Sequence, residues 1–341
     1  MKGIVRKAAN FALANPICGA MLKGLWDGRA SIFLLHRLYD EAHASDGTLL
    51  RSITESIRAL RGAGATFVSV RDLVTAALAG RPPRPGSVAF TIDDGYADQG
   101  TLAREFIRND CPVSIFLISG FIDGTNWAWD EKLAYCVGKS TATQLLLPNP
   151  IGALQLTNAS LKQMAVDRLQ RYVKSLSWDA AEALLSEIYR GLGVFPPEEP
   201  PSHCTPMNWD EIRKLESEGV EFGPHSVTHR VASSLSSVDS YREISDSWAR
   251  LQEELRNPLP VYAWPTGRSC DYRASDVAAA RSVGLAAALA TNDNYANFAA
   301  TEEPHRLYAL DRFAFAPEAD INLQYGTIIE RLKSRTRAAF A

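Results

Sequence analysis

Short apolar runs alternate along the chain with segments in which apolar residues recur every three or four positions. The runs predict strands at residues 31–35, 66–70, 88–92, 112–118, 220–223, 261–264, 285–290 and 306–315. The segments between them predict helices at residues 49–60, 72–79, 101–108, 208–218, 238–255 and 274–283. Strands separated by single helices are typical of a parallel sheet. Because no strand is followed by a glycine-rich phosphate loop, we predict an α/β fold in which about seven parallel strands close into a (β/α) barrel rather than an open sheet.

The alternation of strand and helix pauses between residues 126 and 206. This stretch holds two helical segments and a proline-rich end, at residues 161–176, 179–192 and 195–201. The same alternation flanks it on both sides, so we predict a helical insertion into a single barrel domain of residues 31–315. Outside the barrel we predict an N-terminal helical segment, residues 1–30, and a C-terminal helix, residues 316–341.

The composition argues against several classes of protein. With 341 residues and 46% hydrophobic residues, the chain can bury a large core. Its net charge of −3 and the lack of a basic block argue against nucleic acid as a partner. No run reaches the ~18 apolar residues that a membrane-spanning helix requires. The cysteines are scattered and form no C-x-x-C pair, which favours a reducing compartment and thus a cytoplasmic protein.

Residues 1–30 leave two interpretations open. Apolar residues recur there at roughly helical spacing and basic residues flank them, which is compatible with a helix lying on the anionic inner face of a membrane. An ordinary helix packed on the barrel is the alternative. A cleaved signal peptide is disfavoured because Asn15, Pro16 and Gly19 interrupt the apolar run and no clear cleavage site follows.

The apolar run 88–92 ends directly in two carboxylates, Asp93 and Asp94, which are followed by Gly95. Adjacent like charges at the edge of a buried strand repel each other and must be paired or neutralised. A divalent cation does this by taking one carboxylate as a ligand and holding the other ionised nearby. The alternative is a helix N-cap at Asp94 followed by a turn at Gly95.

Two histidines, His225 and His229, follow the predicted strand 220–223. On a helical turn, residues four apart face the same way, so two neutral imidazoles can bind one metal ion. Other polar residues follow predicted strands in the same way: Asp93, Asp94, His36 and the segment Pro265-Thr266-Gly267. Barrel enzymes assemble their active sites at the carboxyl ends of the strands, so we expect all of these residues to meet there.

Three segments together resemble the motifs of polysaccharide deacetylases, the NodB-homology group or carbohydrate esterase family 4. Thr-Ile-Asp-Asp-Gly at residues 91–95 resembles the T-F-D-D-G motif, and His-Ser-Val-Thr-His at residues 225–229 resembles H-[ST]-x-x-H. Tyr-Ala-Trp-Pro-Thr-Gly at residues 262–267 is similar to the F-A-Y-P-Y-G form of the third motif. The resemblance covers roughly residues 31–315 and implies a distorted barrel with fewer than eight strands.

The resemblance also implies roles for individual residues. Asp94, His225 and His229 would hold one divalent metal ion, with zinc expected first and cobalt, nickel or manganese as alternatives. Asp93 would act as the catalytic base toward a metal-bound water, and the backbone N–H of Thr266 would bind the oxyanion. We expect the substrate to contact five residues: Tyr96, Trp264, Pro265, Thr266 and Gly267. Aromatic residues that could stack on a sugar, with packing in the core as the alternative, are Trp127, Trp129, Tyr96 and Trp264.

Two departures from the family pattern leave roles open. Trp264 stands where many members have an arginine that orients the base, and the late histidine that serves as general acid has no clear counterpart. The candidates for this acid are His305 and His36, the latter within a Leu-His-Arg sequence at the end of the first strand. Leu-Asp-Arg-Phe at residues 310–313 resembles the L-P-R ending of some branches.

These observations predict a metal-dependent hydrolase that removes the N-acetyl group, or another short acyl group, from an amino sugar. Its partner would be an N-acetylated polysaccharide or a lipid-linked saccharide. One alternative is a catalytically inactive, glycan-binding or scaffold member of the same fold, which the two departures suggest. The other is a non-haem iron oxygenase, which also uses two histidines and a carboxylate but usually in an all-β chain.

Overall fold

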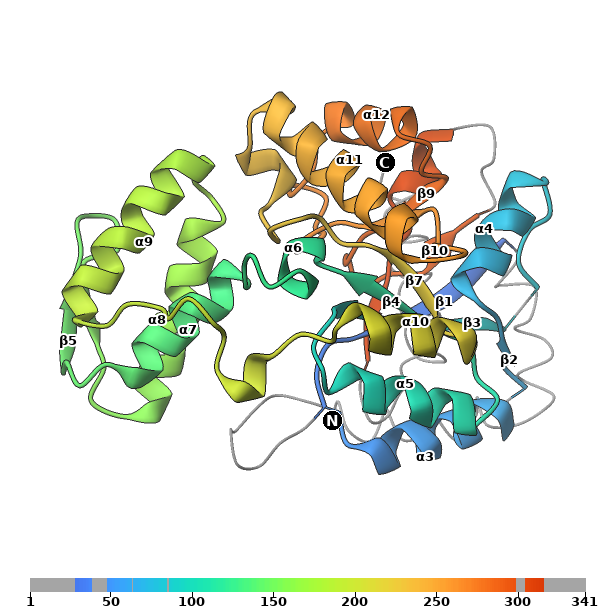
Figure 1. Ribbon diagram of the computed structural model, residues 1–341, viewed down its shortest axis with the longest axis horizontal. Coiled ribbons are helices and arrows are strands. Elements are labelled where there is room, and N and C mark those ends of the chain that lie inside the picture. The colour runs from blue at the N-terminus through green and yellow to red at the C-terminus, as the bar shows by residue number, and fades with distance from the viewer. Residues whose placement is uncertain (1–27, 39–47, 63, 85, 299–303, 316–341) are drawn as a thin grey trace, which may run out of the picture.

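The computed structural model describes residues 28–38, 48–62, 64–84, 86–298 and 304–315 (Figure 1). The predicted C-terminal helix, and all but the end of the predicted N-terminal segment, lie outside these residues. Among the helices described, none is both long and apolar enough to cross a membrane.

Among the described residues, the main sheet contains seven strands: β1 Arg29–Leu35, β2 Thr66–Phe67, β3 Ser87–Asp94, β4 Val113–Leu117, β7 Glu221–Pro224, β10 Ala296–Asn297 and β11 Phe313–Ala314. A parallel pair beside it is formed by β8 Val261–Ala263 and β9 Ala287–Leu289. The main sheet runs in the order β10–β1–β3–β4–β7, with β2 paired to β3 and β11 paired to β1. All of these pairings are parallel except that of β1 with β10. The central strand β3 is buried at every position, as its apolar and β-branched composition allows.

The sheet curls toward a closed barrel. The pair β8–β9 continues it beyond β7, and the Leu259 amide donates to the Phe222 carbonyl across this joint at 2.7 Å. On the other side, Leu310 bridges to Leu289 shortly before β11 joins β1. The predicted barrel of about seven parallel strands is therefore confirmed. It is distorted because β7 and β8 are not joined by a regular ladder of hydrogen bonds.

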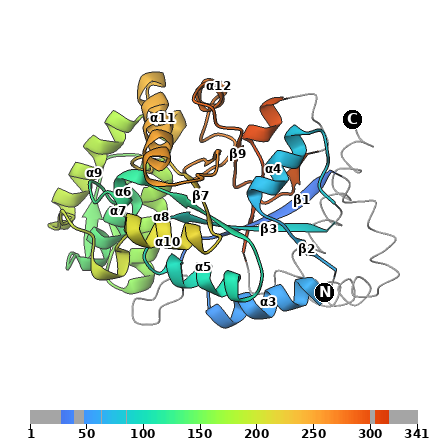
Figure 2. The same cartoon turned by 45° about the vertical axis from the view of Figure 1, so that its right-hand side comes forward.

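The helices around the sheet are α3 Leu50–Gly62, α4 Val70–Leu78, α5 Gln99–Arg108, α6 Ser119–Ile122, α10 Trp209–Ser217, α11 Ser237–Glu254 and α12 Ala274–Ser282. In Figures 1 and 2, α3, α5 and α10 lie on one side of the sheet, and α4, α11 and α12 lie on the other. Each buries an apolar stripe; in α3 the stripe is Ile53, Ile57 and Leu60. Short 3-10 helices are found at Ser202–Cys204, Ala232–Ser234 and Pro304–Tyr308.

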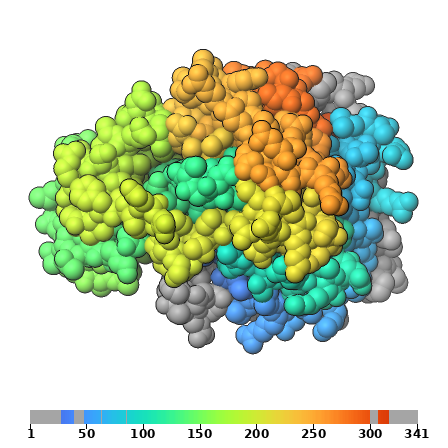
Figure 3. Space-filling view, in the orientation of Figure 1, coloured from blue at the N-terminus to red at the C-terminus, as the bar shows by residue number. Residues whose placement is uncertain are grey.

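The insertion forms a lobe beside the barrel, coloured green to yellow in Figure 3. Its elements are α7 Trp129–Lys139, β5 Gln144–Leu146, β6 Ala153–Gln155, α8 Ala159–Val173 and α9 Trp178–Leu192. It has an apolar core of its own, in which Leu133, Leu169 and Ile188 are fully buried. The two predicted helices are present as α8 and α9, whereas α7 and the antiparallel β5–β6 hairpin were not predicted.

The register of the sheet brings three strand ends together. Asp94 at the end of β3 pairs with Leu117 at the end of β4, and Leu117 pairs with Pro224 at the end of β7. His225 follows Pro224 directly. The acids after β3 and the histidine after β7 thus lie at the same edge of the barrel, where the polar site was predicted.

Candidate active site

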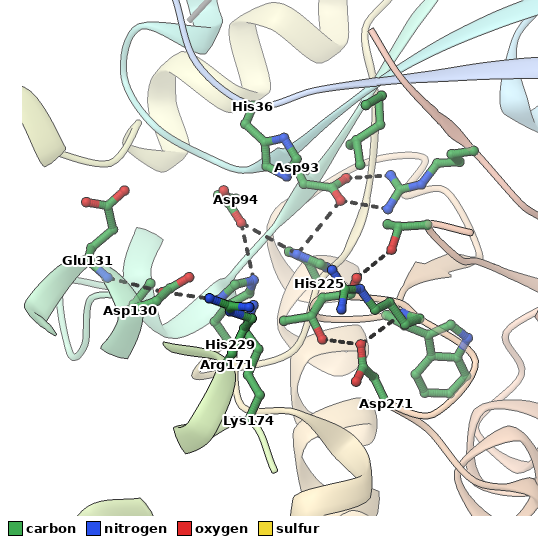
Figure 4. Close-up of a pocket in the computed structure, with 18 of the residues that line it drawn as sticks. His36, Asp93, Asp94, Asp130, Glu131, Arg171, Lys174, His225, His229 and Asp271 are labelled. Carbon is green, nitrogen blue, oxygen red and sulfur yellow. Dashed lines mark hydrogen bonds and ion pairs between the residues drawn. The ribbon is translucent and has the colours of Figure 1, made fainter. Parts of the chain in front are cut away.

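The strand β3 ends in two acids that face one cavity (Figure 4). Side chains of consecutive strand residues normally point to opposite faces of a sheet. The backbone of Asp94 has φ 92°, and this turn brings the carboxylates of Asp93 and Asp94 to the same side. Gly95 continues the turn with φ 95°, and a Cβ there would lie 2.8 Å from Ile122 Cδ1. A glycine is therefore required after the two acids.

The buried side chain of Gln99 fixes this turn. Its amide nitrogen donates to the carbonyls of His36 and Asp93, at 2.6 and 2.5 Å, and its Oε1 accepts from the Gly95 amide at 3.0 Å. These hydrogen bonds join the end of β1 to the end of β3. Gln99 was not predicted as a site residue, because a single glutamine carries no signal of such a role.

His225 is oriented by the backbone of two neighbouring strands. Its amide donates to the Leu117 carbonyl at 2.8 Å, and its Nδ1 lies 2.7 Å from the Ala263 carbonyl. A carbonyl oxygen can only accept, so Nδ1 carries the proton and Nε2 presents a lone pair. Nε2 lies 3.5 Å from Asp94 Oδ1. The ring is therefore held in the tautomer that a metal ligand needs.

The prediction that His225 and His229 sit on a helical turn was wrong. Ser226 and His229 both have left-handed backbones, with φ 67° and 60°, and the Ser226 hydroxyl accepts a hydrogen bond from the His229 amide at 2.9 Å. The segment is a tight loop, and it nevertheless brings the two rings to a centroid separation of 5.0 Å. Convergence of the imidazoles thus comes from a strained loop and not from helical periodicity.

Glu243 of α11 holds this loop from behind. Its carboxylate accepts from the amides of Val227 and Thr228, at 2.9 and 2.8 Å, and from the Thr228 hydroxyl at 2.6 Å. Arg230 supplies the balancing positive charge at 2.5 Å. Such charge-assisted hydrogen bonds satisfy backbone donors that a loop would otherwise leave unpaired. The sequence analysis had not identified Glu243.

Asp94, His225 and His229 offer ligand atoms that all lie within 4.8 Å of one another. Asp94 Oδ1 is 3.5 Å from His225 Nε2 and 3.6 Å from His229 Nε2. Ligands of a tetrahedral zinc ion lie roughly 3.3 Å apart, given metal–ligand distances of ~2.0–2.1 Å. Asp94 Oδ1 is also buried without a hydrogen-bond donor among the described residues. The donor set and this unpaired oxygen fit a divalent cation.

Asp93 forms a buried ion pair with Arg312, from the segment that leads into β11. Its two carboxylate oxygens lie 2.8 and 2.7 Å from Nη1 and Nη2 of Arg312, which is 1% exposed. Arg312 also donates to the Ala290 carbonyl and the Thr91 hydroxyl. Burial alone would raise the pKa of Asp93, but the charges of Arg312 and His225 outweigh it and lower that pKa to about 2. Asp93 is therefore ionised and fixed in orientation.

The third motif lacks an arginine, and the arginine beside Asp93 comes instead from the segment that leads into β11. The sequence analysis noted residues 310–313 for their resemblance but gave Arg312 no role. The sequence did contain an indication of this role for Arg312: it directly precedes the apolar end of the last predicted strand. A charged side chain that is buried there needs a partner of opposite charge. Which partner it finds depends on the closure of the barrel, and the sequence does not show this.

Of the two histidines predicted as general acid, the structure places His36 at the cavity. His36 follows β1, is exposed, and lines the cavity together with Asp93 and Asp94. His305 lies in the 3-10 helix Pro304–Tyr308, and its side chain is outside the described part of the structure. The role of either residue stays a prediction.

The segment Pro265-Thr266-Gly267 follows β8 and reaches the same edge. Thr266 has φ 59°, and its hydroxyl donates to Asp271 at 2.5 Å. Trp264 is 1% exposed, donates its indole N–H to the Tyr308 carbonyl at 2.9 Å and stacks on Tyr272. This burial favours packing over sugar stacking for Trp264, and the other three candidate aromatics are buried as well: Tyr96, Trp127 and Trp129.

The side chains of Asp93, Asp94, His225 and His229 line a cavity of about 790 Å³, to which the insertion also contributes. Asp130, at the start of α7, has Oδ1 3.7 Å from His229 Nδ1. Burial opposes protonation of His229, but Asp130 and Asp94 raise its pKa to about 9, which indicates a surplus of negative charge that favours a bound cation. Beside it, Glu131 lies 3.3 Å from the Tyr96 hydroxyl. The sequence analysis missed both acids of the insertion.

The comparisons with known proteins agree with this geometry. The family model described as polysaccharide deacetylase matches residues 80–288. The comparison with curated protein sequences gave no match. Two similar solved structures are the Streptococcus pyogenes deacetylase PplD in complex with acetate and IcaB from Ammonifex degensii, at 15% and 12% identity and a TM-score of 0.55 each. They cover 86% and 88% of this chain, and 96% and 97% of their own.

A third similar structure is a de-N-acetylase from Aggregatibacter actinomycetemcomitans, at 14% identity and a TM-score of 0.52, covering 87% of this chain and 99% of its own. At such identities the three structures establish the shared fold. The family model covers more than half of the 341 residues and includes both the Asp-Asp-Gly and the His-Ser-Val-Thr-His segments. The chain therefore belongs to the polysaccharide deacetylase family, and it is a carbohydrate deacetylase, a hydrolase that acts on carbon–nitrogen bonds.

Proposed function

We propose that this deacetylase is metal-dependent and removes an N-acetyl or other short acyl group from an amino sugar in a polysaccharide or a lipid-linked saccharide. The observation that carries the proposal is the convergence of Asp94, His225 and His229 beside the arginine-paired carboxylate of Asp93. Of the similar solved structures, one is described as a de-N-acetylase and another as a deacetylase in complex with acetate. These descriptions support an acetyl group as the one removed.

Asp94, His225 and His229 would hold the metal ion, with zinc expected first and cobalt, nickel or manganese as alternatives. When bound, such an ion supplies Lewis acidity toward water and the amide oxygen. Asp93 accepts the proton of the attacking water, and Arg312 keeps the carboxylate ionised and aimed.

The remaining steps concern the oxyanion and the leaving amine. The backbone N–H of Thr266 donates to the oxyanion as it develops. A proton must then reach the sugar nitrogen so that the carbon–nitrogen bond can break. We propose His36 as its donor, because it lines the cavity beside Asp93, with His305 as the alternative.

Substitution Asp93→Asn tests the base. We expect kcat for acetate release to fall by about 10²–10⁴-fold while the metal content stays at the wild-type level. Acetate release from N-acetylated saccharides and elemental analysis of the purified protein measure the two quantities. The matched control is Asp246→Asn on the exposed face of α11, which should leave both unchanged. Turnover by Asp93→Asn at the wild-type rate would refute the assignment.

Two alternative functions were considered, and the observations support them less than they support a metal-dependent deacetylase. An iron oxygenase was weighed for its ligand set, but the chain is an α/β barrel of the deacetylase family. An inactive member was suggested by the missing arginine and the missing late histidine; the ion pair of Arg312 with Asp93 supports an active site without that motif arginine. Acetate release that requires an added divalent ion, and stops on chelation, would exclude an inactive member directly.

We further propose a cytoplasmic location, with peripheral contact to the inner face of the membrane. Four cysteines of the described part, Cys111, Cys136, Cys204 and Cys270, are free thiols, as a reducing compartment favours. The membrane contact would be made by residues 1–30, nearly all of which lie outside the described part. Cell fractionation of the full chain and of a chain lacking residues 1–27 tests both statements.

A further inference from the structure

The insertion places two cations in the same cavity as the candidate metal ligands. Arg171 lies in the last turn of α8, and Lys174 caps the C-terminal end of that helix. Residues three apart on a helix are neighbours on its surface. Both line the cavity together with Asp94 and His229, and Figure 4 shows them on the His229 side of the site.

Neither cation is neutralised within the described part of the chain. Arg171 makes a hydrogen bond from Nε to the Asp167 carbonyl at 3.1 Å, and neither it nor Lys174 has a carboxylate within 4.0 Å there. Two other arginines that line the cavity are paired, Arg37 with Asp98 and Arg312 with Asp93, whereas Arg268 has no carboxylate within 4.0 Å among the described residues. Arg171 and Lys174 therefore differ from Arg37 and Arg312 in having no carboxylate partner in the described part of the chain.

The acids of the cavity are already engaged elsewhere, which leaves this positive charge available. Glu131 lies near the Tyr96 hydroxyl and Arg37, Asp130 lies near His229, and Asp271 accepts from Thr266.

The binding space continues past these cations, away from the candidate metal ligands. A second cavity of about 470 Å³ lies beneath the connection between α8 and α9. It shares Lys174, Ser175 and Ser233 with the first cavity. A saccharide whose reactive sugar lies at Asp94 and the two histidines thus has room for a further sugar unit near Arg171 and Lys174.

We propose that the substrate is an acidic saccharide, with an oxyanion group on the sugar unit next to the one that loses its acyl group. Arg171 and Lys174 bind this carboxylate or phosphate through charge-assisted hydrogen bonds. This inference rests on the proposed function, because it assumes that the N-acylated sugar binds at Asp94, His225 and His229. It adds the chemical class of the neighbouring unit, which the deacetylase family does not define.

The test compares three oligosaccharides of equal length that contain N-acetylglucosamine: a neutral one, one with a uronic acid beside the reactive sugar, and one with a phosphate there. We expect KM of the wild-type protein to be about tenfold lower for at least one acidic substrate than for the neutral one. In the double variant Arg171→Gln/Lys174→Gln, KM for the acidic substrate should rise to that for the neutral one, so that the preference disappears. The two acidic substrates distinguish carboxylate from phosphate.

The matched control is Arg190→Gln on α9, an exposed cation of the same insertion that lines neither cavity. It should keep the preference for the acidic substrate. Cations at the C-terminal end of α8 also complement the helix dipole. If that were their whole role, the double variant would lose thermal stability and keep its preference, and the proposal would be wrong.

Equilibrium binding separates failure of this inference from failure of the proposed function. Calorimetric titration of the same oligosaccharides into the Asp93→Asn protein requires no turnover. Tighter binding of the acidic one, lost on the double substitution, supports the inference even if no acetate is released by any protein. Equal binding of neutral and acidic oligosaccharides overturns it, whatever the deacetylase assay shows.

Discussion

Asp93 and Arg312 form the most constrained ion pair of the site, because both side chains are buried and joined by two hydrogen bonds. A lysine at position 312 keeps the charge but cannot match both carboxylate oxygens at once. We expect Arg312→Lys to lower kcat at least tenfold with little change in KM, because ground-state binding of the sugar does not involve this pair. Steady-state kinetics of acetate release measure the change.

Removal of the positive charge has a different consequence. Arg312→Met leaves the Asp93 carboxylate buried without its partner, which costs roughly 3–5 kcal/mol of unfolding free energy. Urea denaturation compares the variant with the wild-type protein, and Arg281→Met on the exposed side of α12 is the control. A loss no larger than that of the control would show that the pair contributes little to stability.

The same pair predicts how stability depends on pH. Despite its burial, Asp93 has its pKa lowered from 3.8 to about 2 by Arg312 and His225. A carboxylate with a depressed pKa stabilises the folded state above its unfolded-state pKa and loses that contribution as the pH falls through the folded-state value. The stability gap between wild type and Arg312→Met should therefore narrow by roughly 2 kcal/mol between about pH 4 and pH 2. A gap of constant width would contradict the assigned shift.

At the scale of elements, the loop 225–230 depends on α11 for its shape. Glu243 accepts hydrogen bonds from two amides and a hydroxyl of this loop. We expect Glu243→Ala to leave those donors unpaired, to cost about 1–3 kcal/mol of stability and to weaken metal binding. Elemental analysis after dialysis and thermal unfolding measure the two effects. Glu253→Ala, on the exposed face of the same helix, should change neither.

Elements with a clear apolar period could be predicted from the sequence, and those set by distant contacts could not. The strands β3 and β4 appear where buried apolar runs placed them. The strand predicted at residues 66–70 ends at Phe67, because the Ser69 hydroxyl accepts from the Asp72 amide and begins α4. Capping by a serine competes with strand pairing locally, and hydrophobic periodicity does not reveal which one wins.

Likewise, one part of the candidate site could be predicted from the sequence and another part could not. The residue types and the order of the motifs predicted where Asp94, His225 and His229 meet. The left-handed backbones at Asp94, Ser226, His229 and Thr266 could not be predicted, because non-glycine residues adopt them only under restraint from surrounding structure. The restraints come from side chains outside the motifs, such as Gln99 and Glu243.

At the scale of the whole molecule, the barrel and the insertion have separate apolar cores. Leu169 of α8 is fully buried in the core of the insertion. Leu169→Ala should cost about 2–5 kcal/mol, and amide exchange should accelerate in α7, α8 and α9 before it does in β3 and β4. Met164→Ala on the exposed face of α8 is the control. Equal acceleration in barrel and insertion would show that the two unfold as one unit.

The pairing of Asp93 with Arg312 joins positions 219 residues apart, and it also crosses the boundary of the matched family region at residue 288. A polypeptide that ends at that boundary would contain all three candidate metal ligands but not the guanidinium that pairs with Asp93, the proposed base. The same holds during synthesis on the ribosome, since Asp93 emerges long before Arg312. Arg312→Lys in the full chain should therefore weaken hydrolysis more than ion capture, so a residue beyond the matched family region would decide how well the site works.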